Sequence, residues 1–339
     1  MSDIDPTASS RKKDHIELAF KSQVTAAFLD KRFYYEPMLA AHPDEEQQLG
    51  LSFLGFEFRV PMWVSSMTGG TGAARTINQN LARACGEFGF GMGLGSCRGL
   101  LYSDEYLKDF DVKYLIGKDL PLLANLGIAQ IETLYEAGQE HKIIELLEKL
   151  SADGLIIHVN PFQEWLQPEG DRFKYPPLYT IQRVLELISK PVVVKEVGQG
   201  MGPESLRALL ELPLAAIDFA AAGGTNFALL ELLRSDSFAS EQWHPLTQIG
   251  HSSSQMVEFL QKIMADKTLQ LRCKGFIASG GIQSFLDGYH ALSKLPLPSV
   301  YGQASAFLKY ARQDYESLQK FIALQIKGLK IAKAFLRVQ

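Results

Sequence analysis

The residues best suited to chemistry in this chain lie in the run Leu155–Glu164. It begins with apolar, β-branched residues after an Asp153-Gly154 turn signal, as in a strand covered on both faces. Pro161 then stops regular pairing, and the run ends with four polar side chains in close succession: His158, Asn160, Gln163 and Glu164. Polar groups at the carboxyl end of a parallel strand are where α/β proteins place their reactive sites. The plainer alternative is a loop that only solvates the end of the strand.

Other strand-like runs of the chain end in the same way. Ser65–Thr71 carries two adjacent glycines, and Asn125 and Lys195 each close an apolar run. Glycine turns follow three more runs: Gly223-Gly224-Thr225, Ser279-Gly280-Gly281-Ile282-Gln283 and Gly302-Gln303-Ala304-Ser305. One Gly-Gly pair is usually just a tight turn, but turns after the last two strands of a barrel form a typical phosphate site. The set predicts a flat, phosphate-bearing, partly anionic cofactor, and FMN satisfies it better than NAD.

A second anion site is expected beside the first. Arg11, Lys12 and His15 form the densest basic group, and Ser96 and Arg98 follow another strand-like run. Arginine suits bidentate contact with phosphate oxygens, although the first three residues would also fit a solubilising tail. An acid among these cations is explained if it binds Mg²⁺ bridging to phosphates, so we assign Glu164 to the metal. The expected substrate is a diphosphate with a small apolar remainder.

The elements that must position these residues alternate along the chain. Eight short apolar runs are expected as strands: Val60–Ser66, Gly89–Leu94, Leu120–Asn125, Leu155–Asn160, Pro191–Val197, Ala215–Ala220, Gly275–Ser279 and Ser299–Gln303. The expected helices are Phe20–Leu29, Ala73–Phe88, Ile131–Leu150, Tyr179–Ile188, Glu204–Leu212, Ser253–Met264, Ser284–Leu292 and Asp314–Phe335.

This alternation predicts an α/β fold, a (β/α)8 TIM barrel over residues 51–339 with an N-terminal extension over residues 1–50. A doubly wound open sheet is the alternative, but its single glycine-rich fingerprint after the first strand is missing. The polar gap between Arg234 and His251 is expected to be a lid or binding loop.

Composition narrows the class further. The 339 residues are 46% hydrophobic and 21% charged, with a formal net charge of -4, which argues against nucleic-acid binding. Three cysteines without C-x-x-C spacing argue against a disulfide framework or a structural zinc site. The polar first residues lack the apolar segment of a signal peptide, and no apolar run is long enough for a bilayer. A cytoplasmic protein that does not bind membranes is therefore expected.

Several motifs occur in an order that resembles one family. They are Arg-Lys-x-x-His, Ser-Met-Thr-Gly-Gly, Gly-Ser-x-Arg, His-x-Asn-x-x-Gln-Glu, Val-Lys-Glu-Val-Gly, Gly-Gly-Thr and Ser-Gly-Gly-Ile, and they span Arg11 to Phe307. The chain resembles the type 2 isopentenyl-diphosphate isomerases, FMN-dependent (β/α)8 barrels of isoprenoid biosynthesis. The resemblance implies interconversion of isopentenyl and dimethylallyl diphosphate without net redox change, flavin reduction by NADPH, and a homo-oligomer of four or eight chains.

The resemblance also implies roles for individual residues. The diphosphate would be bound by Arg11, Lys12, His15, Ser96, Arg98, His158, Asn160 and Gln163, and Mg²⁺ by Glu164. Gln163 and His158 are the catalytic candidates. FMN would be held by Ser66, Met67, Thr68, Ser96, Asn125, Lys195, Thr225, Gly280, Gly281, Ile282, Gln283, Gln303, Ala304 and Ser305. Cys97, Ala220 and Gln283 depart from the family pattern, which affects the details of flavin binding and leaves the substrate and metal motifs intact.

The chemistry gives a reason for a flavin. An unactivated alkene is a very poor base, and ordinary side chains are mismatched to its protonation near neutral pH. We hypothesise that reduced FMN acts as the acid and the base, with Gln163 orienting flavin or substrate. Two other functions remain open: an FMN-dependent 2-hydroxy-acid oxidase or dehydrogenase, with His158 as base and Arg98 as carboxylate clamp, and a non-catalytic flavin-binding protein. A Cys97 thiol that supplies protons is a further alternative to a cysteine that only fills space.

Overall fold

The computed structural model of the protein describes residues 8–66, 72–235 and 237–339. The chain divides into two compact units, one of residues 1–40 with 335–339 and one of residues 41–334. In the first unit, β1 (Phe33–Tyr35) pairs antiparallel with β12 (Leu336–Val338), and helix α1 spans Ala8–Leu18. Residues 10–40 and 335–339 of this unit are all partly or fully exposed.

The second unit is built on eight parallel strands that close into a barrel in the order β10-β11-β4-β5-β6-β7-β8-β9. The strands are β4 (Met62–Val64), β5 (Gly91–Gly93), β6 (Leu122–Gly127), β7 (Gly154–His158), β8 (Val192–Lys195), β9 (Ala216–Asp218), β10 (Phe276–Ser279) and β11 (Ser299–Gln303). Each lies within one of the eight predicted runs or differs from it by one or two residues, so the (β/α)8 barrel is confirmed.

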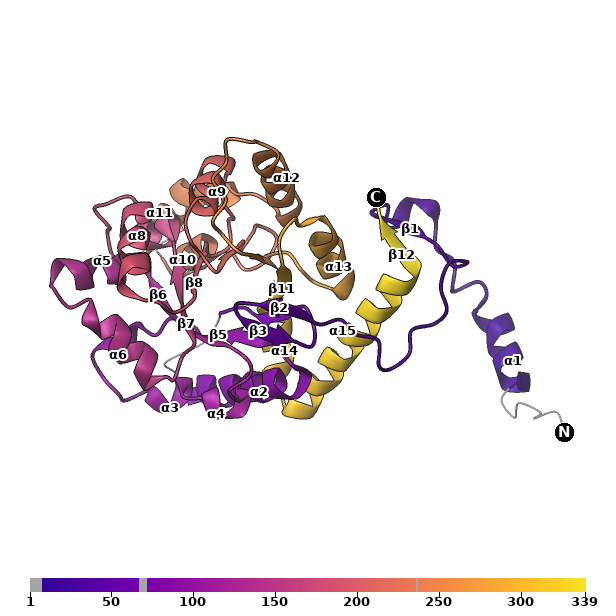
Figure 1. The fold of residues 1–339 in the computed structure, drawn as a ribbon. Coiled ribbons are helices and arrows are strands. Elements are labelled where there is room, and N and C mark those ends of the chain that lie inside the picture. The colour runs from indigo at the N-terminus through magenta and orange to yellow at the C-terminus, as the bar shows by residue number, and fades with distance from the viewer. Residues whose placement is uncertain (1–7, 67–71, 236) are drawn as a thin grey trace. The chain divides into compact units, whose positions relative to one another are not determined.

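Helices follow the barrel strands (Figure 1), and most of them bury apolar residues in the same core as the strands. The helices are α2 (Gly72–Phe88), α3 (Leu107–Phe110), α4 (Lys113–Ile116), α5 (Ile128–Glu136), α6 (His141–Lys149), α7 (Pro161–Leu166), α8 (Pro177–Leu187), α9 (Pro203–Leu210), α10 (Phe227–Arg234), α11 (Ser237–Trp243), α12 (Ser253–Met264), α13 (Phe285–Lys294), α14 (Ser305–Ala311) and α15 (Tyr315–Phe335). The antiparallel pair β2 (Leu51–Phe53) and β3 (Phe56–Phe58) precedes the barrel, and short 3-10 turns occur at Ala26–Phe28, Arg98–Leu101 and His244–Gln248.

Three predicted elements differ from the structure. The helix expected over Phe20–Leu29 is wrong: α1 ends at Leu18, whose carbonyl accepts from the N–H of Ser22, while the Ser22 hydroxyl donates to Ala19 O. Such local side-chain bonds compete with helix continuation. The helix expected over Ile131–Leu150 is broken into α5 and α6 around Gly138, which has φ +65°. The gap after Arg234 is largely helical rather than an open loop.

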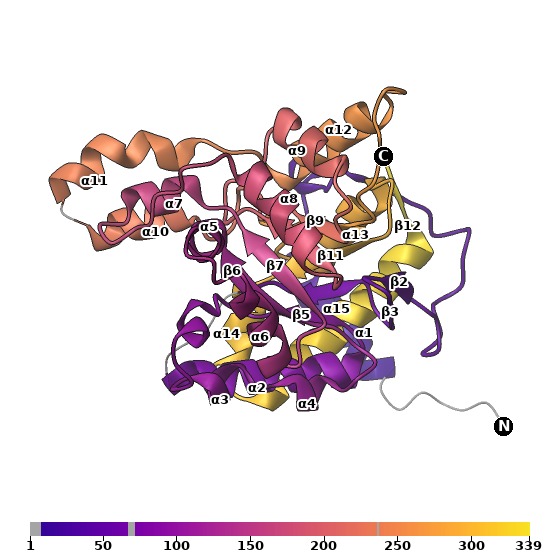
Figure 2. The same cartoon turned by 60° about the vertical axis from the view of Figure 1, so that its left-hand side comes forward.

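Helices α7, α10 and α11 form a group of their own beside the barrel (Figure 2). Helix α10 packs against α7 and against α11. A small apolar cluster of Leu166, Ala228 and Leu232 joins α7 to α10. Because α7 directly follows β7, this packing brings α10 next to the polar residues at the end of that strand. Within the described ranges, no helix has both the length and the apolarity needed to cross a bilayer.

Candidate active site

A cavity at the carboxyl end of the barrel brings together most of the predicted cofactor residues. It is lined by the ends of β4, β8, β10 and β11 and by the turn after β9. The predicted residues on its wall are Ser66, Lys195, Thr225, Gly280, Gly281, Ile282, Gln303, Ala304 and Ser305. Ala220, where the chain departs from the family pattern, lines it as well, as do Ser65 and Ser279 from the predicted strand ends. Parallel strands explain the convergence, because all their carboxyl ends meet at one rim.

The wall of this cavity carries polar atoms that need a partner. The hydroxyls of Ser65 and Ser66 and Oε1 of Gln303 are buried and have no hydrogen-bond partner among the described residues. Buried polar groups are normally hydrogen-bonded, so such atoms in one cavity indicate a polar ligand. A Cβ on Gly302 would lie 2.5 Å from Ser65 Oγ, and one on Gly224 would lie 3.3 Å from the backbone nitrogen of Gly281. Because glycine has no Cβ, these positions allow neighbouring segments of the cavity wall to lie close together.

Lys195 on the cavity wall and Asp218 on the neighbouring strand β9 carry groups of opposite charge. They are partners in the register of β8 and β9, and both are buried. Lys195 Nζ donates to Glu196 O at 2.7 Å, while Asp218 accepts from the hydroxyl of Ser279. Burial raises the pKa of Asp218, and the charge of Lys195 acts against this rise. The pair suits an anionic ligand in the cavity. The Lys195 ammonium can bind the negative charge of that ligand, and the Asp218 carboxylate balances the positive charge of the buried ammonium.

Asn125 and His158 form a fixed pair on the neighbouring strands β6 and β7. Asn125 Nδ2 donates to Leu94 O at 3.0 Å, so its Oδ1 faces His158 Nδ1 at 2.8 Å and accepts from it. Burial, with the charge of Lys195, lowers the pKa of His158 to about 3. The ring is therefore neutral at physiological pH, and its Nε2 is left as an acceptor.

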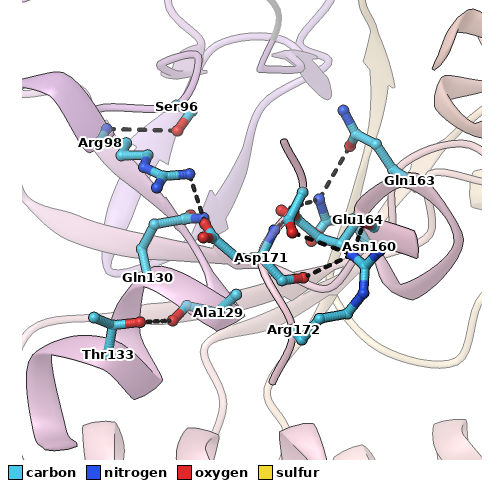
Figure 3. Close-up of polar contacts among 11 residues, drawn as sticks. Ser96, Arg98, Ala129, Gln130, Thr133, Asn160, Gln163, Glu164, Asp171 and Arg172 are labelled. Atoms are coloured by element: carbon cyan, nitrogen blue, oxygen red, sulfur yellow. Dashed lines mark hydrogen bonds and ion pairs between the residues drawn. The ribbon is translucent and has the colours of Figure 1, made fainter. Parts of the chain in front are cut away.

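Asn160, Gln163 and Glu164 form a hydrogen-bonded group at the start of α7 (Figure 3). Asn160 Nδ2 donates to Gln163 Oε1 at 3.1 Å and to Glu164 Oε1 at 3.0 Å. Asn160 Oδ1 is buried and has no hydrogen-bond partner within the described ranges. A carboxylate beside such an amide oxygen fits a hard divalent cation that takes its other ligands from phosphate and water. Among the described residues, no three His, Cys, Asp or Glu side chains are grouped so that they could hold a metal ion, so a metal here would depend on those outside ligands.

Glu231 is a site residue that the sequence reasoning missed. It is buried on α10, and its Oε1 accepts from Gln163 Nε2 at 3.2 Å. Its Oε2 accepts from Arg234 Nη1 at 2.6 Å. The signal was present in the sequence as a lone acid in the apolar helix Phe227–Arg234, but only the packing of α10 on α7 places it beside Gln163.

Asp171 is the second missed residue, and it joins two of the predicted ones (Figure 3). Its Oδ2 lies 2.6 Å from Arg98 Nη1 and accepts from Gln130 Nε2 at 3.0 Å. Its backbone N–H donates to Glu164 Oε2 at 2.7 Å. Arg98 and Glu164, assigned to the substrate phosphate and the metal, are thus linked through one residue between α7 and α8.

The remaining predicted residues do not line the described wall of the cavity or lie outside the described residues. Arg11, Lys12 and His15 are exposed on α1, which belongs to the first unit. Met67 and Thr68 lie outside the described residues. Ser96 and Gln283 are exposed and do not line the cavity. Cys97 is fully buried, and burial raises the pKa of its thiol to about 12, which favours the space-filling alternative.

A separate cavity of about 490 Å³ lies on the outer side of β7 and β8. Its lining is mostly apolar and includes Val159, Val194 and Glu196, which alternate along the chain with the site residues. It contains none of the predicted residues, so the candidate active site is the one at the strand ends.

Comparison with known proteins relates the chain to two groups. No protein-family model matches it. It is 33% identical over 326 residues to an isopentenyl-diphosphate delta-isomerase of Rickettsia typhi, covering 95% of this chain and 91% of that protein. The isopentenyl-diphosphate delta-isomerase of Rickettsia africae is also 33% identical, over 327 residues, with the same coverage of 95% and 91%.

Solved structures show the same fold at low identity. A mandelate oxidase variant with a monooxide FMN adduct has a TM-score of 0.54 and 13% identity, covering 91% of this chain and 89% of that one. The flavin-binding domain of baker's yeast flavocytochrome b2 has a TM-score of 0.60 and 13% identity, covering 89% of this chain and 72% of that one.

Proposed function

The chain belongs to the isopentenyl-diphosphate delta-isomerase family, and from this we propose that it is an FMN-dependent, type 2 isomerase. It would interconvert isopentenyl diphosphate and dimethylallyl diphosphate. One observation carries the proposal: a cavity with unpartnered buried polar atoms shares the barrel rim with the Asn160–Gln163–Glu164 group. The first feature suits a bound cofactor, and the second suits a metal-bound diphosphate.

FMN fits the cavity by the chemistry of its wall. Ser65, Ser66 and Gln303 would form hydrogen bonds with the polar edge of the flavin ring and with the ribityl chain. Lys195 would lie near the part of the ring that carries negative charge. The Gly280-Gly281 turn would bind the phosphate. The likeness of the fold to a mandelate oxidase with an FMN adduct and to the flavin-binding domain of flavocytochrome b2 supports this choice. When bound and reduced, by NADPH as we propose, FMN supplies an electron-rich ring with exchangeable protons. The isomerisation adds one proton to the terminal carbon and removes one from the internal CH₂, so no net electrons move.

The side chains of α7 would hold the diphosphate. Glu164 and Asn160 Oδ1 would bind Mg²⁺, and Arg98 would meet a phosphate oxygen. Arg11, Lys12 and His15 are proposed to add positive charge from α1. Binding the phosphates away from the reacting carbons provides energy that positions the small apolar tail.

Gln163 and Glu231 are the side chains best placed to govern the proton steps. Gln163 is held at both ends of its amide, by Asn160 and by Glu231, so its orientation is set before a substrate arrives. His158 is neutral and could accept a hydrogen bond at Nε2. A histidine with a pKa of about 3 is a weak base for removing a proton beside a carboxylate. This disfavours the hydroxy-acid oxidase alternative.

Two broader features are proposed on the family likeness. The chain would work as a homo-oligomer of four or eight copies, and in the cytoplasm. The first unit, whose residues 10–40 and 335–339 are all partly or fully exposed, would gain burial in such an assembly.

An anaerobic assay tests the function. Protein with reduced FMN, Mg²⁺ and isopentenyl diphosphate should form dimethylallyl diphosphate, and omission of the reductant should stop turnover. Oxidation of lactate or mandelate with flavin bleaching would instead support an oxidase. Flavin binding with conversion of neither substrate class would support a non-catalytic flavin protein.

A further inference from the structure

Arg98 and Glu164 are connected by a single short segment, residues 167–176, which joins α7 to α8. Gly170 lies so close to the end of α7 that a Cβ there would overlap the carbonyl oxygen of Glu164. Arg172 donates to the same carbonyl and to Trp165 O, and its guanidinium lies 4.7 Å from the Trp165 ring centroid. Both neighbours of Asp171 are therefore fixed on α7.

Asp171 itself is held from three sides. Its Oδ2 meets Arg98 Nη1 at 2.6 Å and Gln130 Nε2 at 3.0 Å, and its N–H meets Glu164 Oε2 at 2.7 Å (Figure 3). Arg98 carries five N–H donors in a rigid fork, and within the described ranges its side chain bonds only to Asp171. The guanidinium is thus aligned at one nitrogen and keeps the rest of its fork for an anion.

We propose that Asp171 is a positioning residue that aims Arg98 at a substrate phosphate while its backbone N–H orients the metal-binding carboxylate of Glu164. The inference rests on the proposed function, since it requires that this site takes a diphosphate. The charge of Asp171 lowers the net positive charge beside the anion, and pre-alignment of the arginine outweighs that loss. In the alternative, the Asp171 carboxylate would be mobile and would only occupy the position of a phosphate. Its two side-chain partners, Arg98 and Gln130, and its fixed backbone argue against this alternative.

The two roles of Asp171 can be separated by substitution. Asp171→Ala removes the carboxylate and keeps the backbone N–H, so it should affect Arg98 alone. Calorimetric titration with inorganic pyrophosphate in saturating Mg²⁺ should show affinity about tenfold weaker than in wild type. Asp171→Asn keeps an oxygen acceptor for Arg98 and should recover about half of that loss on a logarithmic scale. In both variants, the Mg²⁺ concentration for half-maximal pyrophosphate binding should stay within about twofold of the wild-type value.

A double-mutant cycle separates positioning from general damage. In an Arg98→Ala background, Asp171→Ala should cause almost no further loss of pyrophosphate affinity. Asp266→Ala is the matched control, because Asp266 pairs with Arg207 at 2.7 Å at similar exposure away from the site. It should leave pyrophosphate binding unchanged.

Opposite results overturn the inference. Tighter pyrophosphate binding in Asp171→Ala would mean that Asp171 competes with the phosphate. An unchanged affinity, or an equal loss with and without Arg98, would mean that it does not act through that arginine. Wild-type protein that binds pyrophosphate but does not isomerise would remove the proposed function alone, and wild-type protein that binds none would overturn both.

Discussion

Replacing Lys195 tests the arrangement of opposite charges on β8 and β9. Lys195→Met keeps the length of the side chain and removes the ammonium that faces Asp218 across β8 and β9. Asp218 is fully buried, and its Oδ2 has no hydrogen-bond partner among the described residues. Removing one member of a buried charge pair destabilises a protein by roughly 3–5 kcal/mol, because the other charge stays uncompensated. We expect about 3 kcal/mol at pH 8, because Lys195 is not in direct contact with Asp218 and Ser279 still donates to it.

The loss should depend on pH in a defined direction. Burial raises the pKa of Asp218 above its value in the unfolded chain, and Lys195 opposes this rise. Without Lys195 the folded pKa rises further, so the folded variant binds a proton that the unfolded chain releases. The stability gained from that proton is lost as pH rises through the folded pKa. The variant should therefore be closer to wild type at pH 5.5 than at pH 8.

Urea unfolding of the flavin-free protein at both pH values measures this effect without a ligand contribution. Adding Asp218→Asn to Lys195→Met should restore most of the stability and remove most of the pH dependence. His158 also faces Lys195, so a remaining dependence in the double variant is assigned to that ring. A loss that is equal at both pH values, or a double variant no more stable than the single one, would refute the reasoning.

Three further predictions concern single positions. Cys97→Ser should keep near wild-type turnover, and iodoacetamide at pH 8 should not label Cys97 in the folded protein, because burial raises the pKa of its thiol to about 12; labelling would contradict this. Glu164→Gln should raise the Mg²⁺ concentration for half-maximal turnover at least about tenfold, and an unchanged Mg²⁺ dependence would remove Glu164 from the metal site. Gly280→Ala should lower stability by at least about 1–2 kcal/mol in thermal unfolding, because Gly280 has φ +83° and a Cβ would overlap Ala221; an unchanged Tm would show that the turn can rearrange.

The barrel strands were predictable because their signal is local. Runs such as Pro-Val-Val-Val-Lys195 are short, apolar and β-branched between turn residues, which is typical of a strand covered on both faces. The error at Phe20–Leu29 has a different origin. Residues 10–40 of that unit are all partly or fully exposed, so apolar spacing there did not indicate a buried face. Gly138 in turn shows that one residue with positive φ can split a continuous apolar pattern.

The candidate site was predictable where it depends on strand ends and unpredictable where it depends on packing between distant segments. Nine of the predicted cofactor residues line one cavity because closure of a parallel barrel brings every strand end to the same rim. Glu231 lies 68 residues from Gln163, and Asp171 lies 73 residues from Arg98. Neither residue is part of a sequence motif.

By itself, the order of strands, glycine turns and polar strand ends determined that this chain is a barrel with a site at its carboxyl rim. Each of these features depends on residues that are close together in the sequence and on the spacing of the apolar ones. The state of the site was decided by the tertiary structure alone: a neutral His158, a Gln163 held between two partners, and an Arg98 aligned by Asp171. Protonation and orientation depend on burial and on the charges that folding brings near, and spacing along the chain carries neither quantity.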